Sequence, residues 1–303
     1  MNGRKRPDAE HPSCAYRTSR NSKEYSMNII LYKAPNCLRC NIVKSYLEAN
    51  GIPYEKFDLA DDKDIVNKFY RDNRARLYRN PEGVEFPMFH ETEGDVILQG
   101  TGVVLAWLLA GNALDSCVTR SDLLHGWISG LYVSQCPDGQ EDNFLELIRL
   151  LSRGGLQVCL QSDGRKADLL EKILSEGLVS RVILNVPGPA GLYPQAVGGS
   201  VGPDFAAELK KSVELVKAHP DHVIRIWLTP LKEADGSLRW PTPAEAGEAA
   251  KMVADACGDM MLPIGIQACA EVPAGMEALD NLLPYRSKVR NALPKAEILK
   301  NEA

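Results

Sequence analysis

The chain has 303 residues, of which 45% are hydrophobic and 25% are charged, an ordinary balance for a globular protein. Its net charge of −5 gives no electrostatic reason to expect binding to nucleic acid or to a membrane surface. The longest apolar run, residues 103–114, is shorter than the roughly 20 residues that span a bilayer, so we expect a core helix there. At about 100–200 residues per domain, the length predicts two domains.

Residues 1–26 differ from the rest of the chain because they are polar, lean basic and carry no hydrophobic periodicity. We expect a disordered tail there, or a translation start at Met27. The segment lacks the apolar central stretch of a signal peptide, so we expect a cytoplasmic protein. Cytosolic thiols are kept reduced, and a close cysteine pair in such a protein is more often catalytic or metal-binding than structural.

The first domain is predicted over residues 27–112, where strand and helix patterns alternate in the order βαβαββα. In chain order these elements cover residues 27–32, 38–49, 52–60, 61–79, 84–89, 95–99 and 101–111. Asn50-Gly51 supplies the signal that ends the first helix.

Near Trp127 the sequence changes to a regular alternation of strand and helix patterns. This change predicts a second domain over residues 123–290, after a polar linker at 113–122. Strand patterns cover residues 127–134, 156–162, 180–186, 223–230 and 262–268. Helical patterns between them cover residues 141–153, 166–177, 203–218 and 243–256. This alternation predicts a parallel sheet or a partial βα barrel, so the fold class is α/β. Residues 291–303 are expected to form a C-terminal tail.

Cys37 and Cys40 stand where a predicted strand turns into a helix. The helix N-terminus offers unpaired N–H groups and partial positive charge, which stabilise a thiolate at Cys37 and lower its pKa. Lys33 adds a second positive charge nearby. Cys40 lies one turn into the helix, close enough to resolve a mixed disulfide at Cys37. The pattern predicts thiol–disulfide exchange, in which electrons pass in pairs between disulfides.

Phe86-Pro87 lies at the start of a predicted strand. Proline lacks the N–H that a strand interior needs, so it is found at strand starts and edges. A cis peptide bond before Pro87 would explain its position, and such bonds are uncommon outside fixed turns.

The stretches LYKAPNCLRC, EFPMF and QGTGVVLAWL, taken with the element order, resemble the glutaredoxin branch of the thioredoxin fold over about residues 27–111. The resemblance implies that Cys37 is the nucleophile and Cys40 the resolving thiol. It also implies that Lys33 helps to stabilise the thiolate.

The same resemblance assigns the substrate-binding residues. It implies that Pro87 is a cis-proline beside the cysteine pair and presents the Phe86 backbone to a bound peptide or glutathione. Gly100 and Gly102 match part of the glycine turn before the last helix. Val103 and Val104 replace the acidic residues that hold the amino end of glutathione in the family. Glutathione, as a co-substrate, and thioredoxin reductase therefore both stay open as the reductant.

Residues 126–268 resemble the radical S-adenosylmethionine enzymes that activate anaerobic ribonucleotide reductase and pyruvate formate-lyase. The cysteine triplet that holds the family's four-iron cluster is absent. Residues 135–138, Gln-Cys-Pro-Asp, replace the Gly-Gly-Glu-Pro motif, and residues 185–187, Asn-Val-Pro, replace the acidic-x-Lys motif. We therefore expect a degenerate partial barrel with no iron–sulfur cluster and no S-adenosylmethionine. The family context implies a disulfide-containing protein partner such as an anaerobic ribonucleotide reductase or its activase.

Two other interpretations of the cysteine pair stay open: an iron–sulfur or zinc carrier, and a non-catalytic docking or assembly protein. A carrier needs more ligands, and the sequence contains no second pair of cysteines at close spacing. The remaining cysteines are spread singly, at Cys14, Cys117, Cys136, Cys159, Cys257 and Cys269. We expect Cys159 in the core. Cys136 is either a small buried residue or a third thiol that takes electrons from Cys40. The Gly/Pro-rich segment 188–203 is expected to form a mobile loop or a lid.

Overall fold

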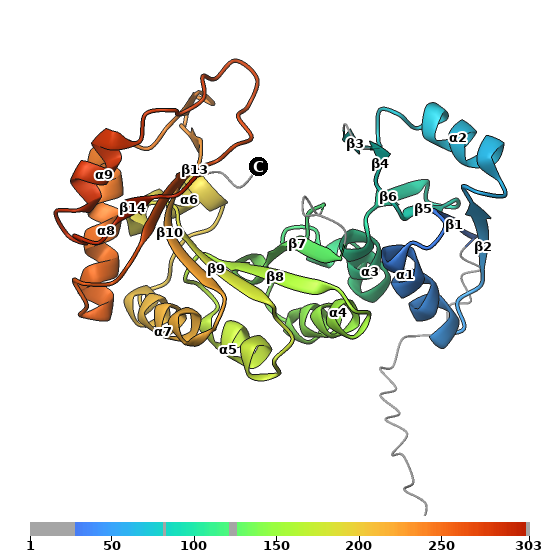
Figure 1. Cartoon of the computed structure of the whole chain (residues 1–303), viewed down its shortest axis with the longest axis horizontal. Coiled ribbons are helices and arrows are strands. Elements are labelled where there is room, and N and C mark those ends of the chain that lie inside the picture. The colour runs from blue at the N-terminus through green and yellow to red at the C-terminus, as the bar shows by residue number, and fades with distance from the viewer. Residues whose placement is uncertain (1–27, 81–82, 121–125, 301–303) are drawn as a thin grey trace, which may run out of the picture.

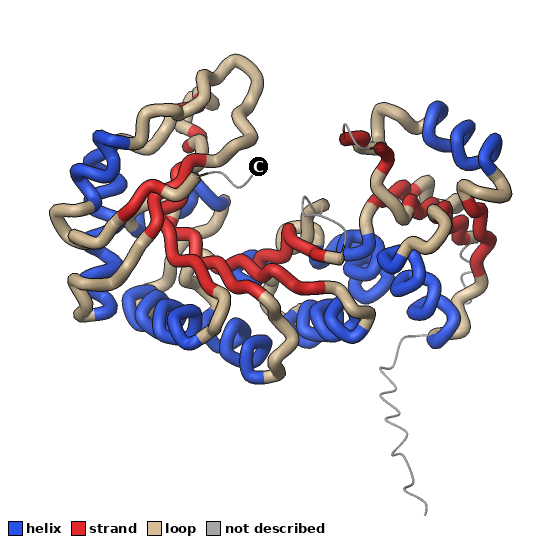
Figure 2. The backbone as a smooth tube through the Cα atoms, in the orientation of Figure 1, coloured by secondary structure: helices blue, strands red, loops and turns tan. Residues whose placement is uncertain are grey.

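A computed structural model describes residues 28–80, 83–120 and 126–300. The predicted tail at 1–26, with Cys14, lies outside the described residues, as do 121–122 of the predicted linker and 301–303 of the predicted C-terminal tail. The protein is a mixed α/β structure, as predicted, with two sheets that carry helices (Figure 1, Figure 2). We call residues 28–110 the N-terminal unit and residues 127–298 the C-terminal unit.

The N-terminal unit contains a four-stranded sheet in the order β2-β1-β5-β6. β1 and β2 are parallel, whereas β5 is antiparallel to both β1 and β6. The elements are β1 (Ile29–Lys33), α1 (Leu38–Ala49), β2 (Tyr54–Asp58), α2 (Lys63–Asp72), β3 (Arg79–Asn80), β4 (Gly83–Val84), β5 (Met88–Glu91), β6 (Val96–Gln99) and α3 (Thr101–Ala110). The predicted order of major elements is therefore present, and α1 has the predicted bounds.

Two boundaries in the N-terminal unit differ from the prediction. The second helix ends at Asp72 rather than near residue 79, where β3 begins a short hairpin with β4. The strand predicted at 84–89 begins only at Met88, after Pro87. In both places the apolar pattern of the sequence extends beyond the regular element. Leu77 lies after the end of α2 and Phe86 before the start of β5, yet both pack in a hydrophobic cluster.

The apolar residues of the N-terminal sheet pack on both of its faces. On one face, Ile29, Leu31 and Phe89 join the buried side chains of α1 and α3 in the main core. On the other face, Tyr32 stacks on Phe69 of α2 with ring centroids 3.9 Å apart. α1 and α3 therefore lie on one side of the sheet and α2 on the other (Figure 1).

The C-terminal unit is built on a six-stranded sheet in the order β14-β13-β10-β9-β8-β7, and every neighbouring pair in it is parallel. Its strands are β7 (Trp127–Tyr132), β8 (Gln157–Ser162), β9 (Arg181–Val186), β10 (His222–Leu228), β13 (Gly265–Ala268) and β14 (Glu297–Ile298). Helices α4 (Glu141–Arg153), α5 (Ala167–Ser175), α7 (Phe205–Ala218) and α8 (Pro243–Cys257) cover its outer side (Figure 2). The five predicted strands and four predicted helices are all present.

Smaller elements complete the C-terminal unit and correct two expectations. The Gly/Pro-rich segment 188–203 is not an open loop, because Tyr193 within it is fully buried and donates a 2.8 Å hydrogen bond to the Asp163 carbonyl. The described part of the predicted C-terminal tail is not free, because β14 adds to the edge of the sheet beside β13. The smaller elements are η1 (Gly111–Leu114), η2 (Val133–Gln135), η3 (Ala190–Leu192), α6 (Tyr193–Val197), β11 (Leu231–Lys232), β12 (Leu238–Arg239) and α9 (Leu283–Val289).

The described part of the predicted polar linker, residues 113–120, packs against the C-terminal unit through some of its side chains, while others are exposed. Leu114 and Cys117 are fully buried, and Val118 forms an antiparallel bridge with Leu131 of β7. Thr119 N–H donates to the Gly130 carbonyl at 2.8 Å. The linker therefore acts as an extra strand segment against the first strand of the C-terminal unit.

One hydrophobic core runs through both units. Val104 and Leu105 of α3 belong to the same buried cluster as Leu131 of β7 and Phe144 of α4. The backbones also approach closely, since a Cβ added at Gly154 would lie 2.5 Å from the Ile42 side chain of α1. Burial of apolar surface is the main stabilising contribution to folding, so each unit depends on the other for its stability.

Glu245 fixes the start of α8 and predicts a pH dependence of stability. The Glu245 carboxylate accepts from the Thr242 N–H at 2.6 Å in a capping box, and from both terminal nitrogens of Arg239 at 2.8 Å. The hydrogen bonds from Arg239 lower the pKa of Glu245 from 4.5 to about 2. Because the folded-state pKa is the lower one, its stabilising contribution is present above pH 4.5 and is lost as the pH falls towards 2.

We expect Glu245→Gln, which keeps a capping acceptor but removes the charge, to lower the urea midpoint at neutral pH. The difference from the wild type should shrink as the pH falls below 4.5. Urea unfolding at a series of pH values, with Thr242→Ala as the control for the cap alone, measures this. A difference that stays constant with pH would mean that the carboxylate charge does not contribute.

Candidate functional site

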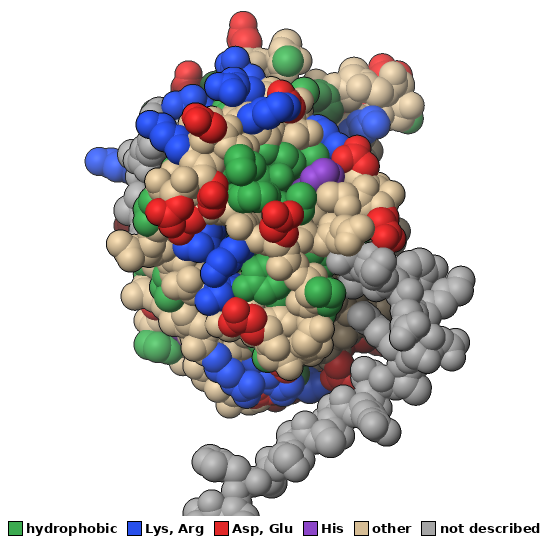
Figure 3. Space-filling view, turned by 90° about the vertical axis from the view of Figure 1, so that its right-hand side faces the viewer, with side chains coloured by type: hydrophobic (Ala, Val, Ile, Leu, Met, Phe, Trp, Pro, Cys, Tyr) green, Lys and Arg blue, Asp and Glu red, His purple; other side chains and the backbone are tan. Residues whose placement is uncertain are grey.

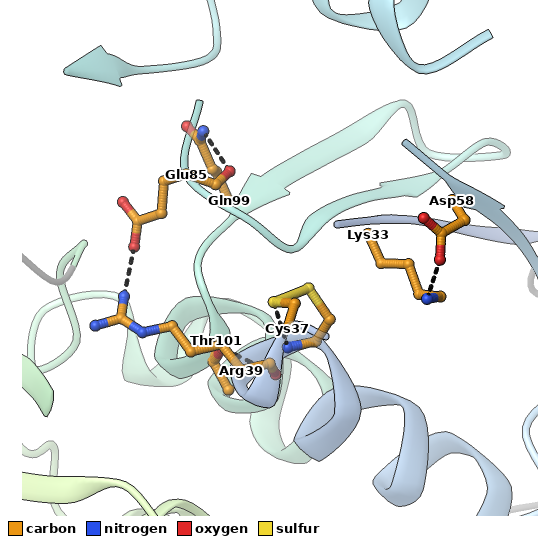
Figure 4. Close-up of a disulfide and its surroundings, with 8 residues drawn as sticks. Lys33, Cys37, Arg39, Asp58, Glu85, Gln99 and Thr101 are labelled. Carbon is orange, nitrogen blue, oxygen red and sulfur yellow. Dashed lines mark hydrogen bonds and ion pairs between the residues drawn. A yellow bond between two sulfur atoms is a disulfide. The ribbon is translucent and has the colours of Figure 1, made fainter. Parts of the chain in front are cut away.

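Cys37 and Cys40 lie at the N-terminus of α1, as predicted, and form a disulfide with a Cα–Cα distance of 5.3 Å (Figure 4). Cys37 is the N-cap residue, and its sulfur accepts from the Cys40 N–H at 3.1 Å. Asn36 just before it adopts a left-handed φ of 54°, which asparagine tolerates better than most residues. Cys37 is half-buried, whereas Cys40 is fully buried. An incoming disulfide can therefore reach Cys37 first.

Lys33 is near this site but is engaged elsewhere. Its register partner across β1 and β2 is Asp58, and the Lys33 ammonium donates to the Asp58 carboxylate. This bond lowers the pKa of Asp58. In Figure 4 the Lys33 side chain points to Asp58 and not to the disulfide. Its positive charge is offset locally, so the N–H groups of α1 are the nearer source of positive potential for Cys37.

The Phe86-Pro87 peptide bond is cis, as predicted. The pairing of Tyr32 with Met88 places Pro87 at the end of β1 from which the turn to Cys37 leaves. The Pro87 carbonyl accepts from the Gly100 N–H at 2.9 Å. The structure therefore brings Pro87 and Gly100 to the end of the sheet that carries the cysteine pair. Phe86 packs against the cluster on the α2 side of the sheet.

The two glycines expected at the site lie in different surroundings. Gly100 has a φ of 92°, which favours glycine, and is the N-cap of α3 next to the Glu85 carboxylate. Gly102 is buried, and a Cβ there would meet Val118 and Ile128 at 3.4 and 3.5 Å. Gly102 therefore contacts the junction between the units and not an open surface beside Cys37.

Arg39, between the two cysteines, is a site residue that the sequence prediction missed. Its side chain is only 9% exposed, and its guanidinium donates to Glu85 Oε1 at 3.2 Å (Figure 4). The guanidinium also donates to the Trp127 carbonyl of β7. Burial lowers the pKa of Arg39, and the charge of Glu85 opposes this shift. The helix that carries the cysteines is thus bonded directly to the first strand of the C-terminal unit.

Further contacts strengthen this connection, which we call the Arg39–Glu85 bridge. Arg120 of the linker segment lies 3.7 Å from Glu85 Oε2, and its guanidinium stacks 3.3 Å from the centre of the Tyr78 ring. Thr101 Oγ1 donates to the Arg39 carbonyl at 3.1 Å. The only signal in the sequence was a charged residue between two cysteines, because its partner Glu85 is 46 residues away and Trp127 is 88 residues away.

A cleft of about 1260 Å³ runs between α1 and α4 and begins at Leu38, next to Cys37. Asn41 and Ser45 line it on the α1 side, and Asn143 and Glu146 line it on the α4 side. Figure 3 looks onto the N-terminal unit, where hydrophobic side chains gather in two patches with charged side chains around and between them. The cleft is large enough to contact a protein partner rather than a small molecule alone.

The motif positions expected in the C-terminal unit are bonded internally. Asn185 donates to Gln161 at 2.7 Å and accepts from Arg225 at 2.6 Å, and Arg225 donates to Gln267 at 2.5 Å. These side chains come from four neighbouring strands and form a polar row across the sheet. Near β7, Asp138 pairs with Lys166. In the described part of the chain, no three His, Cys, Asp or Glu side chains group closely enough to hold a metal ion.

No second cysteine pair is close in the sequence, but the fold places Cys117 and Cys136 side by side, where each shifts the pKa of the other. They are 19 residues apart and come from the linker and from the end of η2, so spacing gave no signal of their contact. Cys159 is buried in the core, as predicted.

No protein-family model matches the chain. A search of the curated proteins likewise finds no match. Among the described helices, none combines the length and apolar character that a bilayer crossing requires.

Proposed function

We propose that the N-terminal unit is a glutaredoxin-like thiol–disulfide oxidoreductase that works through Cys37 and Cys40. One observation carries the proposal: the pair lies at the start of α1 with the Cys37 sulfur half-buried, the Cys40 sulfur enclosed, and the Cys40 N–H directed at Cys37. This is the asymmetry that an attacking and a resolving thiol need.

In the proposed cycle the reduced Cys37 thiolate attacks one sulfur of a target disulfide, and the other target sulfur leaves as a thiolate. The Cys40 thiol gives its proton to that leaving thiolate. Cys40 then attacks the mixed disulfide at Cys37 and releases the second target thiolate. The target gains two electrons and the Cys37–Cys40 disulfide forms. While Cys37 is a thiolate, the Cys40 N–H and the partial positive charge at the start of α1 stabilise it.

The strand order β2-β1-β5-β6, the cis-proline before β5 and the glycine at the start of α3 support a thioredoxin-like fold for this unit. The curved parallel sheet with helices on its outer side supports a partial barrel of the radical S-adenosylmethionine type for the C-terminal unit. In the polar row across the sheet, Arg225 donates a hydrogen bond to Asn185. This internal use of the two side chains supports a degenerate barrel.

A protein disulfide is the substrate class that fits best. Val104 is fully buried, and valine at 103 and 104 provides no carboxylate for the amino end of glutathione. The cleft along α1, which is lined from Leu38 onward, has room for a polypeptide segment. An anaerobic-type ribonucleotide reductase or its activase is the proposed partner, with glutathione or thioredoxin reductase as the source of electrons. The proposed compartment is the cytoplasm.

A docking or assembly protein is the second candidate, favoured by the same cleft between α1 and α4. In that case the C-terminal unit would bind the reductase or activase, and the cysteine pair would not take part. Binding retained in a variant that lacks both cysteines, without any reductase activity of the wild type, would favour it. An absorbance scan of protein purified without oxygen separates the oxidoreductase and the docking protein from a metal or iron–sulfur carrier.

The test is disulfide reduction by the wild-type protein and by the Cys37→Ser/Cys40→Ser double variant. Insulin turbidity with dithiothreitol and a glutathione-coupled NADPH assay on a small mixed disulfide run side by side. The control variant is Cys257→Ser/Cys269→Ser, which removes two half-buried cysteines outside the site. We expect activity in the wild type and the control and none in the double variant. A wild type with accessible thiols and no activity in either assay would overturn the proposal.

A further inference from the structure

Cys117 and Cys136 lie together in the core shared by the two units. Cys117 is fully buried and Cys136 is 2% exposed. Both belong to the cluster that contains Val104 of α3 and Phe144 of α4. The proposed cycle at Cys37 and Cys40 uses neither thiol.

Backbone contacts hold the two segments against each other. The Tyr132 N–H donates to the Cys117 carbonyl at 2.8 Å, and Ser116 Oγ donates to the Gln135 carbonyl at 3.0 Å. η2 then folds the chain back, with the Cys136 N–H bonded to the Val133 carbonyl at 3.1 Å. The two cysteines are therefore brought together by fixed backbone and not by flexible side chains alone.

The two thiols are not equivalent. The interaction between the two side chains raises the pKa of Cys117 and lowers that of Cys136, and burial adds to the first shift and opposes the second. Among the nearby charges, the Glu141 and Asp138 carboxylates raise the pKa of Cys136 and the Lys166 ammonium lowers it, with Glu141 the largest of the three. Lys166 itself holds a left-handed φ of 58° and pairs with Asp138 and Glu141. Because its pKa is the lower one, Cys136 is the sulfur that ionises first.

Access to the pair is from the Cys136 side. Cys136 is 2% exposed and is followed by the half-buried Pro137 and by Asp138, whose side chain is 93% exposed, whereas Cys117 is fully buried. Cys117 lies behind Cys136 and has the Leu114 carbonyl 3.2 Å from its sulfur.

We propose that Cys117 and Cys136 are a second redox-active pair, an oxidation site that peroxide closes to a disulfide. The Cys136 thiolate attacks one peroxide oxygen, the O–O bond breaks, and Cys136 sulfenic acid and hydroxide form. The Cys117 sulfur then attacks the sulfenic sulfur, its thiol proton leaves with the sulfenic hydroxyl as water, and the disulfide forms. The two cysteines lose two electrons, which reduce the peroxide. The product ties the linker segment to the end of η2.

The experiment uses the full chain carrying Cys37→Ser/Cys40→Ser, so that its result is independent of the proposed reductase function. The protein is treated with hydrogen peroxide under native conditions, denatured, alkylated and mapped by mass spectrometry without reduction. We expect one cross-linked species that joins the peptides of Cys117 and Cys136, while Cys159, an equally buried cysteine in β8, is alkylated as a free thiol.

A second variant separates the two sulfurs. With Cys117→Ala added, Cys136 should stop at the sulfenic acid and be trapped by dimedone, whereas Cys136→Ala should leave Cys117 unmodified. Two results would overturn the proposal: free thiols at both positions after peroxide treatment, or Cys136 sulfinic acid with no cross-link in the chain that retains Cys117. The cross-link in the parent chain needs no substitution at Cys117 or Cys136, so the conclusion does not depend on how the alanine variants fold.

Discussion

Replacing Cys37 by serine is expected to lower the rate of disulfide reduction by several orders of magnitude, to the background rate of the reductant alone. The serine hydroxyl is not ionised at neutral pH, so no nucleophile remains at the start of α1. Cys40 cannot substitute for it, because its sulfur is enclosed in the core of the N-terminal unit.

Replacing Cys40 by serine should give a different result. Attack by Cys37 is preserved but the resolving sulfur is absent, so a mixed disulfide with the substrate should accumulate. A single-turnover reaction with a protein disulfide, quenched by acid and resolved on non-reducing gels, measures both outcomes. The assignment of roles would be wrong if Cys37→Ser trapped the substrate and Cys40→Ser did not.

The second large effect is expected at Arg39. Arg39→Met keeps most of the packing of the side chain but removes the charge that Glu85 faces, and leaves the Trp127 carbonyl without this donor. Removing one partner of a buried ion pair costs about 3–5 kcal/mol. Because Arg120 remains 3.7 Å from Glu85, we expect a loss of about 3 kcal/mol in the free energy of unfolding, at the low end of that range.

The matched control is Arg149→Met on α4, whose side chain is 29% exposed and pairs with Glu176 at the surface. Surface pairs contribute roughly 0–1 kcal/mol, so this variant should unfold near the wild-type midpoint. Urea unfolding of both variants, followed by a double-mutant cycle with Glu85→Gln, isolates the Arg39–Glu85 coupling. Equal losses at Arg39 and Arg149 would contradict a bridge between the units.

Local patterns predicted the elements that carry the cysteine pair. The apolar spacing of Ile42, Val43 and Leu47 located α1 to the residue, and strand-like runs located β7, β8, β9, β10 and β13. The cis bond before Pro87 followed from the poor fit of proline to a strand interior. Each of these signals lies within a few residues of the feature that it predicts.

The parts that the sequence did not predict depend on residues far apart in the chain. In the sequence, Arg39 is one more departure from a family motif. Its bonding role depends on Glu85 and Trp127, which only the fold brings beside it. Cys117 and Cys136 appeared single because η2 and the Val118–Leu131 bridge bring them together. The linker residues read as polar because two buried positions, Leu114 and Cys117, are too few to show a period. Spacing rules do not describe contacts made by the tertiary fold.

The shared core also has a consequence for synthesis of the chain on the ribosome. α3 is apolar on nearly all sides, and Gly102 packs against side chains that are translated after it, among them Val118 and Ile128. The N-terminal unit therefore cannot cover α3 when its own last residue emerges. It must wait for residues through the end of α4 at Arg153, about 40 residues later, which takes a few seconds at roughly 5–20 residues per second. During that interval a nascent chain exposes an apolar helix, and a chaperone that holds such helices would find its substrate there.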